Sequence, residues 1–587
     1  MSPVSESSLP QAPHNERLSI LQGPSQPELW ETTVGDLADA QAAKYPDRIA
    51  VVSSWQSARI TYRDLSSRSK LVARAILGAR LQQGDCIGVL SGNSYQYLEI
   101  FLGGARIGCP VVTFNNTYSP QELHAAVRQS DCKLLFIAHS IGGRPMRKYV
   151  EKLLQTQSET VLQRITIIGE SEFLRNENGT LISSYEPFLK ELPQDVDETA
   201  LDKAQRNVHP SDILNLQFTS GTTGLPKAAS LTHLNLINNA RFTGHSMLLT
   251  PDDVVCCPPP LFHCFGLVMG FLSSFCYGSV LVFPSDSFNA LKTLDALVKE
   301  KATALLGVPT MFIAELEALE ESGHRVTTVR TGLAAGSHVA PSLMAQLREK
   351  MQVKGMLIAY GMTETSPVTF ITLLNDTEDR MFHSIGKLFP HTGAKIVDHE
   401  GKIVPIGTKG EICTSGFALQ KGYWKNEEKT REVMKYDDDG VRWMHTGDEG
   451  FIDADGYGHI TGRIKDTIIR GGENISPGEI EDCLLDHPDI RECCVVGLAD
   501  RKYGEVVACF LRKAHSNSPS LPDAAIRAWV GKRLGRIKEP KHIFWLGEQG
   551  VGSDLPKTGS GKYQKHLIRA KGNELLKKST LARVWKL

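Results

Sequence analysis

The chain has 587 residues, of which 41% are hydrophobic and 22% are charged, a composition typical of globular proteins. A single hydrophobic core does not extend over such a length, so we expect two or more domains. The formal net charge of −1 provides no overall basic field, which disfavours nucleic-acid binding.

The cysteines and the two ends of the chain bear on the compartment. Twelve cysteines include the adjacent pairs Cys256-Cys257 and Cys493-Cys494, but no C-x-x-C spacing occurs, which indicates reduced thiols inside a cell. Residues 1–28 are rich in Ser, Pro and Gln and predict a disordered tail without a secretory signal. The final Trp585-Lys586-Leu587 shares two residues with the peroxisomal S-K-L address. We expect a cytoplasmic protein, with the peroxisome as the alternative.

The first half of the chain alternates between strand-like and helix-like segments. GDCIGVLSG (84–92) and VVTFN (111–115) are typical of buried strands, and YQYLEIFLGGARIG (95–108) between them is typical of a helix. This alternation predicts an α/β fold, in which a large N-terminal domain contains doubly wound sheets.

An uncharged stretch, GLVMGFLSSFCYGSVLVF (266–283), nearly reaches the length of a membrane span. Glycines and serines interrupt it, and no cluster of Lys or Arg flanks it. We predict instead a buried helix, a turn near Gly278 and a buried strand, and no membrane span.

A second organisation begins near Lys465. Ser476, Pro477 and Glu479 have the spacing of a helix N-cap, a first helical proline and a capping-box glutamate. A strand-like run, CCVVGLA, follows from Cys493. We therefore predict an N-terminal domain over residues 29–464 and a small α+β domain over residues 465–587.

The stretch FTSGTTGLPK (218–227) combines glycines, small hydroxyl residues and one lysine. Backbone N–H groups in such a loop converge readily on an anionic oxygen. The Walker phosphate loop is excluded, because Pro226 precedes Lys227 and Ala228 follows it. The residues of this stretch alone leave a phosphate-binding loop and an ordinary surface turn as alternatives.

Further stretches extend the pattern. They are YGMTET (360–365), HTGDEG (445–450), GRIKDTIIRGGENISPGEIE (462–481) and PKTGSGK (556–562). Together with FTSGTTGLPK they resemble, in order, the motifs of the adenylate-forming superfamily of acyl-CoA synthetases, luciferases and peptide-synthetase adenylation domains. The resemblance implies a large domain followed by a mobile C-terminal lid. It also implies that a carboxylate attacks the α-phosphate of Mg²⁺-bound ATP to give acyl-AMP, and that a thiol, normally that of coenzyme A, then displaces AMP.

The resemblance assigns roles to individual residues. The triphosphate would be held by Thr219, Ser220, Gly221, Thr222, Thr223, Gly224 and Lys227, although Ala228 stands where the family usually has Gly. Mg²⁺ would be held by Glu364 with Thr223. The adenine and α-phosphate would contact Ala335, Gly336, Ser337, Tyr360, Gly361 and Thr363, and the ribose would contact Asp448 and Arg463.

The lid carries the remaining assignments. Lys562 matches the lysine that reaches the carboxylate and the α-phosphate during adenylation, whereas Lys557 has no comparable role in the motif. Lys465 matches the hinge of the lid. Gly471, Gly472 and Glu473 match the segment that lines the path of the pantetheine arm after rotation.

The acid is constrained by PLFHCFG (260–266), which resembles the entrance of the acid pocket and places His263 at its mouth. His263 stands where amino-acid-activating domains tend to have Asp, which disfavours an α-amino acid. The sequence of this stretch is similar to that of medium-chain acyl-CoA synthetases and of fungal stand-alone ligases for siderophore or lipopeptide acids.

Three hypotheses remain. The first is an acyl-CoA ligase that uses ATP, Mg²⁺ and coenzyme A and supplies a separate acyltransferase. The second is an acyl-AMP ligase that loads a separate carrier protein, because no carrier motif follows PKTGSGK. The third is an inactive nucleotide-binding scaffold, which the intact Lys227, Glu364, Asp448 and Lys562 disfavour.

Overall fold

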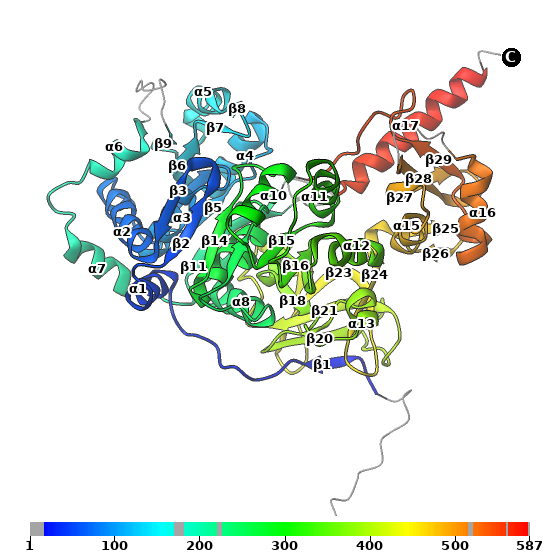
Figure 1. The fold of residues 1–587 in the computed structure, drawn as a ribbon, viewed down its shortest axis with the longest axis horizontal. Helices are drawn as coiled ribbons and strands as arrows, with labels where there is room; N and C mark the ends of the chain where they lie inside the picture. Colours follow the sequence, from blue (N-terminus) through cyan, green and yellow to red (C-terminus); the bar gives the residue numbers. More distant parts are fainter. Residues whose placement is uncertain are drawn as a thin grey trace, which may run out of the picture.

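A computed structural model describes residues 17–169, 181–219, 226–337, 339–514, 521–558 and 562–584. Two large α/β sheets, a smaller antiparallel sheet and a C-terminal sheet form the body of the molecule (Figure 1). Within the described residues no helix combines the length and the apolar character needed to cross a bilayer. All twelve cysteines are free and buried.

The first sheet has seven strands. Their order is β10 (Leu181–Ser184), β9 (Arg164–Ile168), β6 (Cys132–Ala138), β4 (Cys86–Leu90), β5 (Val111–Thr113), β11 (Ile213–Thr219) and β12 (Lys227–Thr232). All neighbours are parallel except β11 and β12, which form an antiparallel pair with Thr219 opposite Lys227. The strands expected near 84–92 and 111–115 are confirmed, as is the helix between them, α3 (Tyr95–Arg106).

The second sheet has nine strands and is parallel through its centre. Their order is β19 (Lys387–Leu388), β18 (Val368–Ile371), β17 (Gly355–Gly361), β16 (Thr331–Ala335), β15 (Ala304–Gly307), β13 (Val254–Cys256), β14 (Val280–Phe283), β2 (Ile49–Ser53) and β3 (Ala58–Thr61). Tyr360 and Ala335 stand at the carboxyl ends of β17 and β16, the edge where open α/β sheets bind ligands.

Apolar packing joins these two sheets into layers. The largest core cluster contains residues of both sheets and of α1 (Val34–Lys44), α2 (Tyr62–Gly78), α3 and α8 (His233–Ser246), which lie between them. The outer face of the nine-stranded sheet packs on α10 (Ala290–Lys299), α11 (Pro309–Ser322) and α12 (Pro341–Met351). The outer face of the seven-stranded sheet packs on α4 (Pro120–Ser130) and α5 (Arg147–Gln155). The predicted doubly wound fold is confirmed.

The apolar stretch 266–283 folds inside this core. A buried π-helical segment, Phe265–Leu272, continues into α9 (Ser273–Tyr277). Gly278 then turns the chain with a φ of +72°, a conformation that suits glycine, and β14 follows. The predicted helix, turn and strand are confirmed.

A six-stranded sheet follows the two large ones. It contains β1 (Ile20–Gln22), β20 (Thr392–Val397), β21 (Gly410–Gly416), β23 (Arg442–Ile452) and β22 (Met434–Tyr436) in that order, with β24 (Gly458–Arg463) paired to β23. The prediction of a disordered tail over residues 1–28 is therefore wrong at its end, because Ile20–Gln22 pairs antiparallel with β20. Residues 1–16 lie outside the described part of the chain.

The C-terminal sheet contains strands from residue 468 onward. They are β25 (Ile468–Arg470), β26 (Glu473–Ile475), β27 (Ile490–Asp500), β28 (Gly504–Lys513) and β29 (His542–Trp545), packed with α15 (Pro477–Leu485), α16 (Asp523–Leu534) and α17 (Lys565–Val584). Figure 1 shows these elements, gold to red, and an ion pair between Arg491 and Glu317 places α11 beside them. The boundary at Lys465 stays a prediction. It falls in a short 3₁₀ turn, Ile464–Asp466, between β24 and β25.

The start of α15 corrects one detail of the sequence reading. Ser476 is the N-cap and Pro477 the first helical residue, as predicted, but the Ser476 side chain makes no capping bond. Its hydroxyl donates instead to the Thr461 carbonyl. Lys538 Nζ binds Glu479 at 2.6 Å, so tertiary partners replace the capping box.

His233 yields a prediction about stability. It is fully buried at the start of α8, and its Nδ1 accepts the Val34 backbone N–H at 3.0 Å. Burial lowers its pKa from 6.5 to about 4. As the pH falls through 6.5, the unfolded chain binds a proton that the folded protein binds only near pH 4, so this contribution to stability is lost over that interval.

We expect His233→Asn, which cannot titrate, to reduce the slope of Tm against pH between pH 7 and pH 5. His399→Asn is the matched control, because His399 is exposed in the folded protein. Thermal unfolding at several pH values measures both slopes. Equal slopes for His233→Asn and the unmodified protein would contradict the assignment.

Candidate active site

Three residues meet where the ends of β17 and β24 lie beside the middle of β23. The Tyr360 hydroxyl donates to Asp448 Oδ2 at 2.8 Å, and Arg463 Nε binds Asp448 Oδ1 at 3.0 Å. Asp448 and Arg463 are paired across β23 and β24, and Asp448 is 5% exposed. Burial first, and then the charge of Asp448, raise the pKa of Tyr360 far above its usual value. The tyrosine therefore stays a neutral donor that orients the carboxylate.

Next to Asp448 the backbone of β23 makes a bulge at residues 446–448, which we call the Asp448 turn, and residues that the sequence reasoning missed support it. Glu411 Oε1 accepts the Gly447 backbone N–H at 3.0 Å, and Glu411 Oε2 lies 2.7 Å from His445 Nδ1. Thr446 Oγ1 accepts the Asp448 N–H at 3.1 Å. Gly447 has a φ of +71°, which favours glycine. One carboxylate thus fixes both sides of the turn.

Glu411, Cys413 and His445 also form the one cluster with metal-ligand chemistry found among the described residues, with ligand atoms within 4.8 Å of one another. Their hydrogen bonds explain the cluster without an ion. Burial alone would raise the pKa of Glu411, but the hydrogen bond and charge of His445 lower it. We interpret the cluster as the support of the Asp448 turn.

Glu364 occupies a second polar centre, in the short turn Thr363–Thr365 after β17. It is 9% exposed, and the Tyr423 hydroxyl donates to its Oε1 at 2.8 Å. Lys227 Nζ lies 4.9 Å from the centre of the Tyr423 ring. Tyr423, which the sequence reasoning did not identify, therefore connects Glu364 to the lysine of the glycine-rich stretch.

The donor set fits a hard cation. A carboxylate with one oxygen bound by a tyrosine hydroxyl retains a second oxygen, and Mg²⁺ typically takes only one or two protein carboxylates. Glu364 can provide that ligand. Ser220, Gly221, Thr222, Thr223 and Gly224 lie outside the described residues. Thr219 and Lys227, on either side of them in the sequence, are paired opposite each other in β11 and β12.

The end of β16 leaves little space around its backbone. Ala335 is buried, and Gly336 has a φ of +97°. A Cβ at Gly336 would lie 3.2 Å from Val308 Cγ1 and 3.6 Å from Lys562 Cε. Only glycine suits both this conformation and this spacing. Ser337 follows directly and is exposed.

Lys562 reaches the end of β16 from the C-terminal domain. Burial and the nearby Arg463 lower the pKa of its ammonium, and Asp448 and Glu364 partly oppose that effect. The structure therefore brings Lys562 together with Gly336, Asp448, Arg463 and Glu364, residues that lie far from it in the sequence.

His263 lies in the same electrostatic neighbourhood. Its Nδ1 accepts the Phe265 backbone N–H at 3.2 Å. Burial, and then the charge of Lys562, lower its pKa to about 3, so the ring is neutral at neutral pH. Next to it, Cys264 Sγ lies 4.0 Å from Thr363 Oγ1, which places Thr363 beside the histidine segment. Gly361 ends β17 between Tyr360 and Thr363.

The residues predicted to form the hinge and the pantetheine path are exposed. Lys465 is exposed in the turn Ile464–Asp466. Gly471 and Gly472, with φ values of +62° and +92°, form the exposed turn between β25 and β26, and a Cβ at Gly472 would meet nothing within 4 Å. Glu473 is exposed beside them. The contacts described for this turn are within the C-terminal domain, including Gly471 N–H to the Tyr503 carbonyl at 2.7 Å.

Comparison with known families identifies both parts of the chain. The model of the AMP-binding enzyme family matches residues 38–424, and that of the AMP-binding enzyme C-terminal domain matches residues 479–562. The chain is 45% identical over 561 residues to acyl-CoA ligase sidI of Aspergillus fumigatus, covering 95% of this chain and 94% of the relative. It is 34% identical to bovine mitochondrial medium-chain acyl-CoA ligase ACSF2, covering 94% of this chain and 89% of that one.

Solved structures agree in fold. The anthranilate CoA ligase AuaEII in complex with anthranoyl-AMP superimposes with a TM-score of 0.80 at 25% identity, over 93% of this chain and 98% of that one. ATP-bound MatB from Rhodopseudomonas palustris gives a TM-score of 0.74 at 25% identity, over 93% of this chain and 100% of that one.

The support of the Asp448 turn is testable. Glu411→Gln removes the charge that holds His445 and the Gly447 N–H, and we expect it to raise KM for ATP roughly tenfold, the effect of one charge-assisted hydrogen bond. Exposed Glu428→Gln is the matched control. Steady-state kinetics at saturating acid measure both variants. A KM for ATP equal to that of the control would refute the role of Glu411.

Proposed function

Because the chain belongs to the AMP-binding enzyme family, we propose that it is an AMP-forming acyl-CoA ligase. It joins a carboxylic acid to AMP with release of pyrophosphate and then transfers the acyl group to coenzyme A. The observation that carries the proposal is the position of Lys562, which reaches from the C-terminal domain to Gly336 and to the charged groups Asp448, Arg463 and Glu364.

Nucleotide binding follows from the strand ends. Asp448 accepts hydrogen bonds from the ribose hydroxyls, and Arg463 and Tyr360 hold the carboxylate in place for them. The Tyr360 ring and the segment of Ala335, Gly336 and Ser337 enclose the adenine. Gly361 allows the close approach of the backbone, and Thr363 contacts the α-phosphate.

The phosphates are met by the glycine-rich stretch. Thr219, Ser220, Gly221, Thr222, Thr223 and Gly224 donate to the β- and γ-phosphates, and Lys227 neutralises charge on the departing pyrophosphate. Glu364, with Thr223, would hold Mg²⁺, which supplies charge neutralisation on the phosphate oxygens.

In the first step a carboxylate oxygen of the acid attacks the α-phosphorus. The bond from that phosphorus to the oxygen bridging the β-phosphate breaks, and pyrophosphate leaves with the electron pair. Lys562 stabilises the negative charge that develops on the oxygens of the α-phosphate and the carboxylate in the transition state. The incoming carboxylate and phosphates are anionic, so they counter the repulsion from Arg463 that lowers the pKa of Lys562.

In the second step the thiol sulfur of coenzyme A attacks the acyl carbonyl carbon. The carbon–oxygen bond to AMP breaks, AMP leaves with the electron pair, and the thiol proton passes to solvent. Rotation about Lys465 withdraws Lys562 and brings Gly471, Gly472 and Glu473 to the site. The open space around Gly472 admits the slim pantetheine arm.

We further propose an acid without a positive charge near its carboxylate. His263 is neutral, so the mouth of the acid pocket offers no anion to pair with an ammonium. A medium-chain fatty, polyketide or similar acid fits this requirement. The thioester then passes to a separate acyltransferase, in the cytoplasm or the peroxisome.

The experiment that tests the function uses the purified protein with Mg²⁺ and ATP. Acids from C2 to C18, aryl acids and hydroxy acids are screened for pyrophosphate and AMP, each with and without coenzyme A. We expect acyl-AMP from at least one uncharged-tail acid and the acyl-CoA when coenzyme A is added. Acyl-AMP that reacts only with a carrier protein would identify a carrier-loading ligase, and no acyl-AMP at all would refute the proposal.

Lys562→Ala separates the two steps. We expect adenylation to fall about 10²–10³-fold, in line with loss of one preorganised charge contact. Thioester formation from supplied acyl-AMP and coenzyme A should change little, because Lys562 leaves the site before that step. Single-turnover assays of each step give the comparison, and an equal loss in both would show that Lys562 acts otherwise.

Lys465→Pro tests the rotation. Proline fixes φ near −65° and restricts the residue before it, so the hinge loses freedom. We expect thioester formation to fall more than adenylation, because only the second step requires rotation. The ratio of the two single-turnover rates is the measurement, and an unchanged ratio would exclude Lys465 as the hinge.

A further inference from the structure

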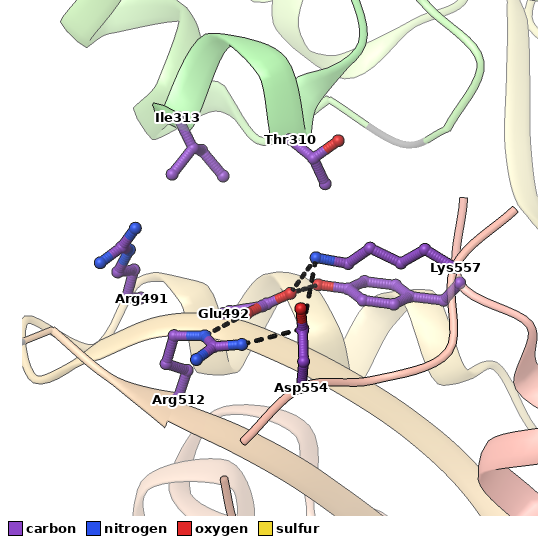
Figure 2. Close-up of a pocket in the computed structure, with 8 residues that line it drawn as sticks. Thr310, Ile313, Arg491, Glu492, Arg512, Asp554 and Lys557 are labelled. Carbon is purple, nitrogen blue, oxygen red and sulfur yellow. Dashed lines mark hydrogen bonds and ion pairs between the residues drawn. The ribbon is translucent and has the colours of Figure 1, made fainter. Parts of the chain in front are cut away.

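A polar pocket of about 300 Å³ lies between α11 and the C-terminal domain. Figure 2 shows Thr310 and Ile313 of α11 on one side and a charged cluster of the C-terminal domain on the other. The centre of that cluster is Glu492 on β27, whose side chain is 12% exposed. None of the motifs in the sequence points to this glutamate.

Glu492 is bound from three directions. Lys557 Nζ lies 2.7 Å from its Oε1, and the Tyr563 hydroxyl donates to the same oxygen at 2.5 Å. Arg512 Nε donates to Oε2 at 2.5 Å. Arg512 is itself fixed by Asp554 Oδ1 at 3.0 Å and by the Ser553 carbonyl at 3.0 Å. In Figure 2 dashed lines from Lys557 and Arg512 reach the Glu492 carboxylate, and another joins Arg512 to Asp554.

Two of these partners flank the residue that acts in adenylation. Lys557 and Tyr563 form an antiparallel bridge. Inside it, the Thr558 N–H donates to the Lys562 carbonyl at 2.7 Å, and the Lys562 N–H donates to Thr558 Oγ1 at 3.1 Å. Outside it, the Gln564 N–H donates to the Pro556 carbonyl at 2.9 Å. The backbone of Lys562 therefore belongs to a hairpin base whose two arms are joined by side chains on Glu492.

We propose that Glu492 is a positioning residue for Lys562: its carboxylate ties together the two arms of the hairpin base, through Lys557 and Tyr563, and so fixes where Lys562 enters the active site. This inference rests on the proposed function. It gives Lys557, the other lysine of PKTGSGK, a role distinct from that of Lys562.

The charge of Glu492 is required for this role. Burial alone would raise its pKa, but the hydrogen bonds from Lys557, Tyr563 and Arg512 outweigh burial and lower it to about 2. The carboxylate is therefore ionised wherever the enzyme works. A glutamine would accept with only one oxygen and would turn N–H donors toward the lysine or the arginine.

Lys557, Tyr563 and Arg512, the groups bound to Glu492, form with it an arrangement that we call the clamp. All four residues belong to the C-terminal domain, so rotation of the domain leaves the clamp intact. A separate ion pair, Arg491 with Glu317 of α11, crosses to the N-terminal domain. The two arrangements predict different defects. Loss of the clamp misplaces Lys562, whereas loss of the ion pair weakens only the contact between the domains.

The test is Glu492→Gln, with Glu574→Gln as the matched control because Glu574 is an exposed carboxylate of the same domain paired with Lys578 on α17. We expect kcat of adenylation to fall about 10- to 100-fold with KM for ATP unchanged, the effect of a small misplacement of a catalytic group. Thioester formation from supplied acyl-AMP should stay within about twofold of the control, since Lys562 does not act there.

A second readout is independent of activity. Hydrogen exchange at the amides of Thr558, Lys562 and Gln564 should accelerate in Glu492→Gln, while exchange in β27 and β28 stays as in the control. Glu492→Asp should recover part of the adenylation rate. If Glu492→Gln does not fold, Tyr563→Phe removes one arm of the clamp and should show the same pattern more weakly.

The outcomes separate the two hypotheses. Equal losses in both half-reactions, or unchanged exchange and unchanged kcat, would overturn the clamp. The proposed function can fail while the clamp stands. In that case the wild-type protein forms no acyl-AMP, but hydrogen exchange at these amides is still faster in Glu492→Gln than in the wild-type protein.

Discussion

The structure depends on the meeting of unlike charges contributed by two domains. Asp448 and Glu364 provide buried carboxylates in the N-terminal domain, Arg463 binds the first of them, and Lys562 arrives from the C-terminal domain. Arg463 opposes the charge of Lys562, so the two cations together favour an anionic occupant between them. A nucleotide and a carboxylate supply that negative charge. Under the proposed function, closure of the C-terminal domain would be coupled to the presence of the substrates, because each substrate reduces the repulsion between Arg463 and Lys562.

Each charged group of the proposed active site is held by a second residue to which the proposed function gives no contact with the substrates. Glu411 fixes the turn of Asp448, Tyr423 orients Glu364, and Glu492 joins the arms beside Lys562. A preorganised charged group must keep its position while charge develops on the reacting atoms of the substrate. A buried hydrogen bond holds the group in that position, so no reorganisation is needed during the reaction. The supporting residues are therefore as much a part of the electrostatic design as the groups that they hold.

Sequence reasoning predicted the regular elements where the local pattern decides them. Apolar runs such as 86–90 pack on both faces as strands, and Gly278 turns the chain where its φ is positive. It failed where a distant partner decides the outcome. Ile20–Gln22 carries no strong strand pattern and becomes a strand because β20, far along the chain, presents a free edge. Ser476 has a capping sequence, but the Thr461 carbonyl binds its hydroxyl instead.

The candidate site follows the same division. Motif resemblance located Asp448, Arg463 and Tyr360, and the structure brings these three into direct contact. Glu411 escaped notice because its role arises from strand register. β21 places Cys413 opposite His445, and Glu411, two residues along, shares that face. No one-dimensional spacing between residues 411 and 445 signals this contact. Tyr423 and Glu492 likewise lie outside the motifs whose residues they support.

The two lysines of PKTGSGK show why geometry is needed to assign chemistry. Both are cations in a segment that resembles a catalytic motif, and composition does not distinguish them. The structure places Lys557 Nζ 2.7 Å from Glu492 and 3.9 Å from Asp554, so its charge is already compensated within the domain. Lys562 instead lies with Cε beside Gly336, among groups of the other domain. A cation compensated by fixed carboxylates gains little from an incoming phosphate, whereas one that faces another cation gains much. Lys557 therefore suits a structural clamp, and Lys562, whose charge Asp448 and Glu364 compensate only in part, suits a transition state that accumulates negative charge.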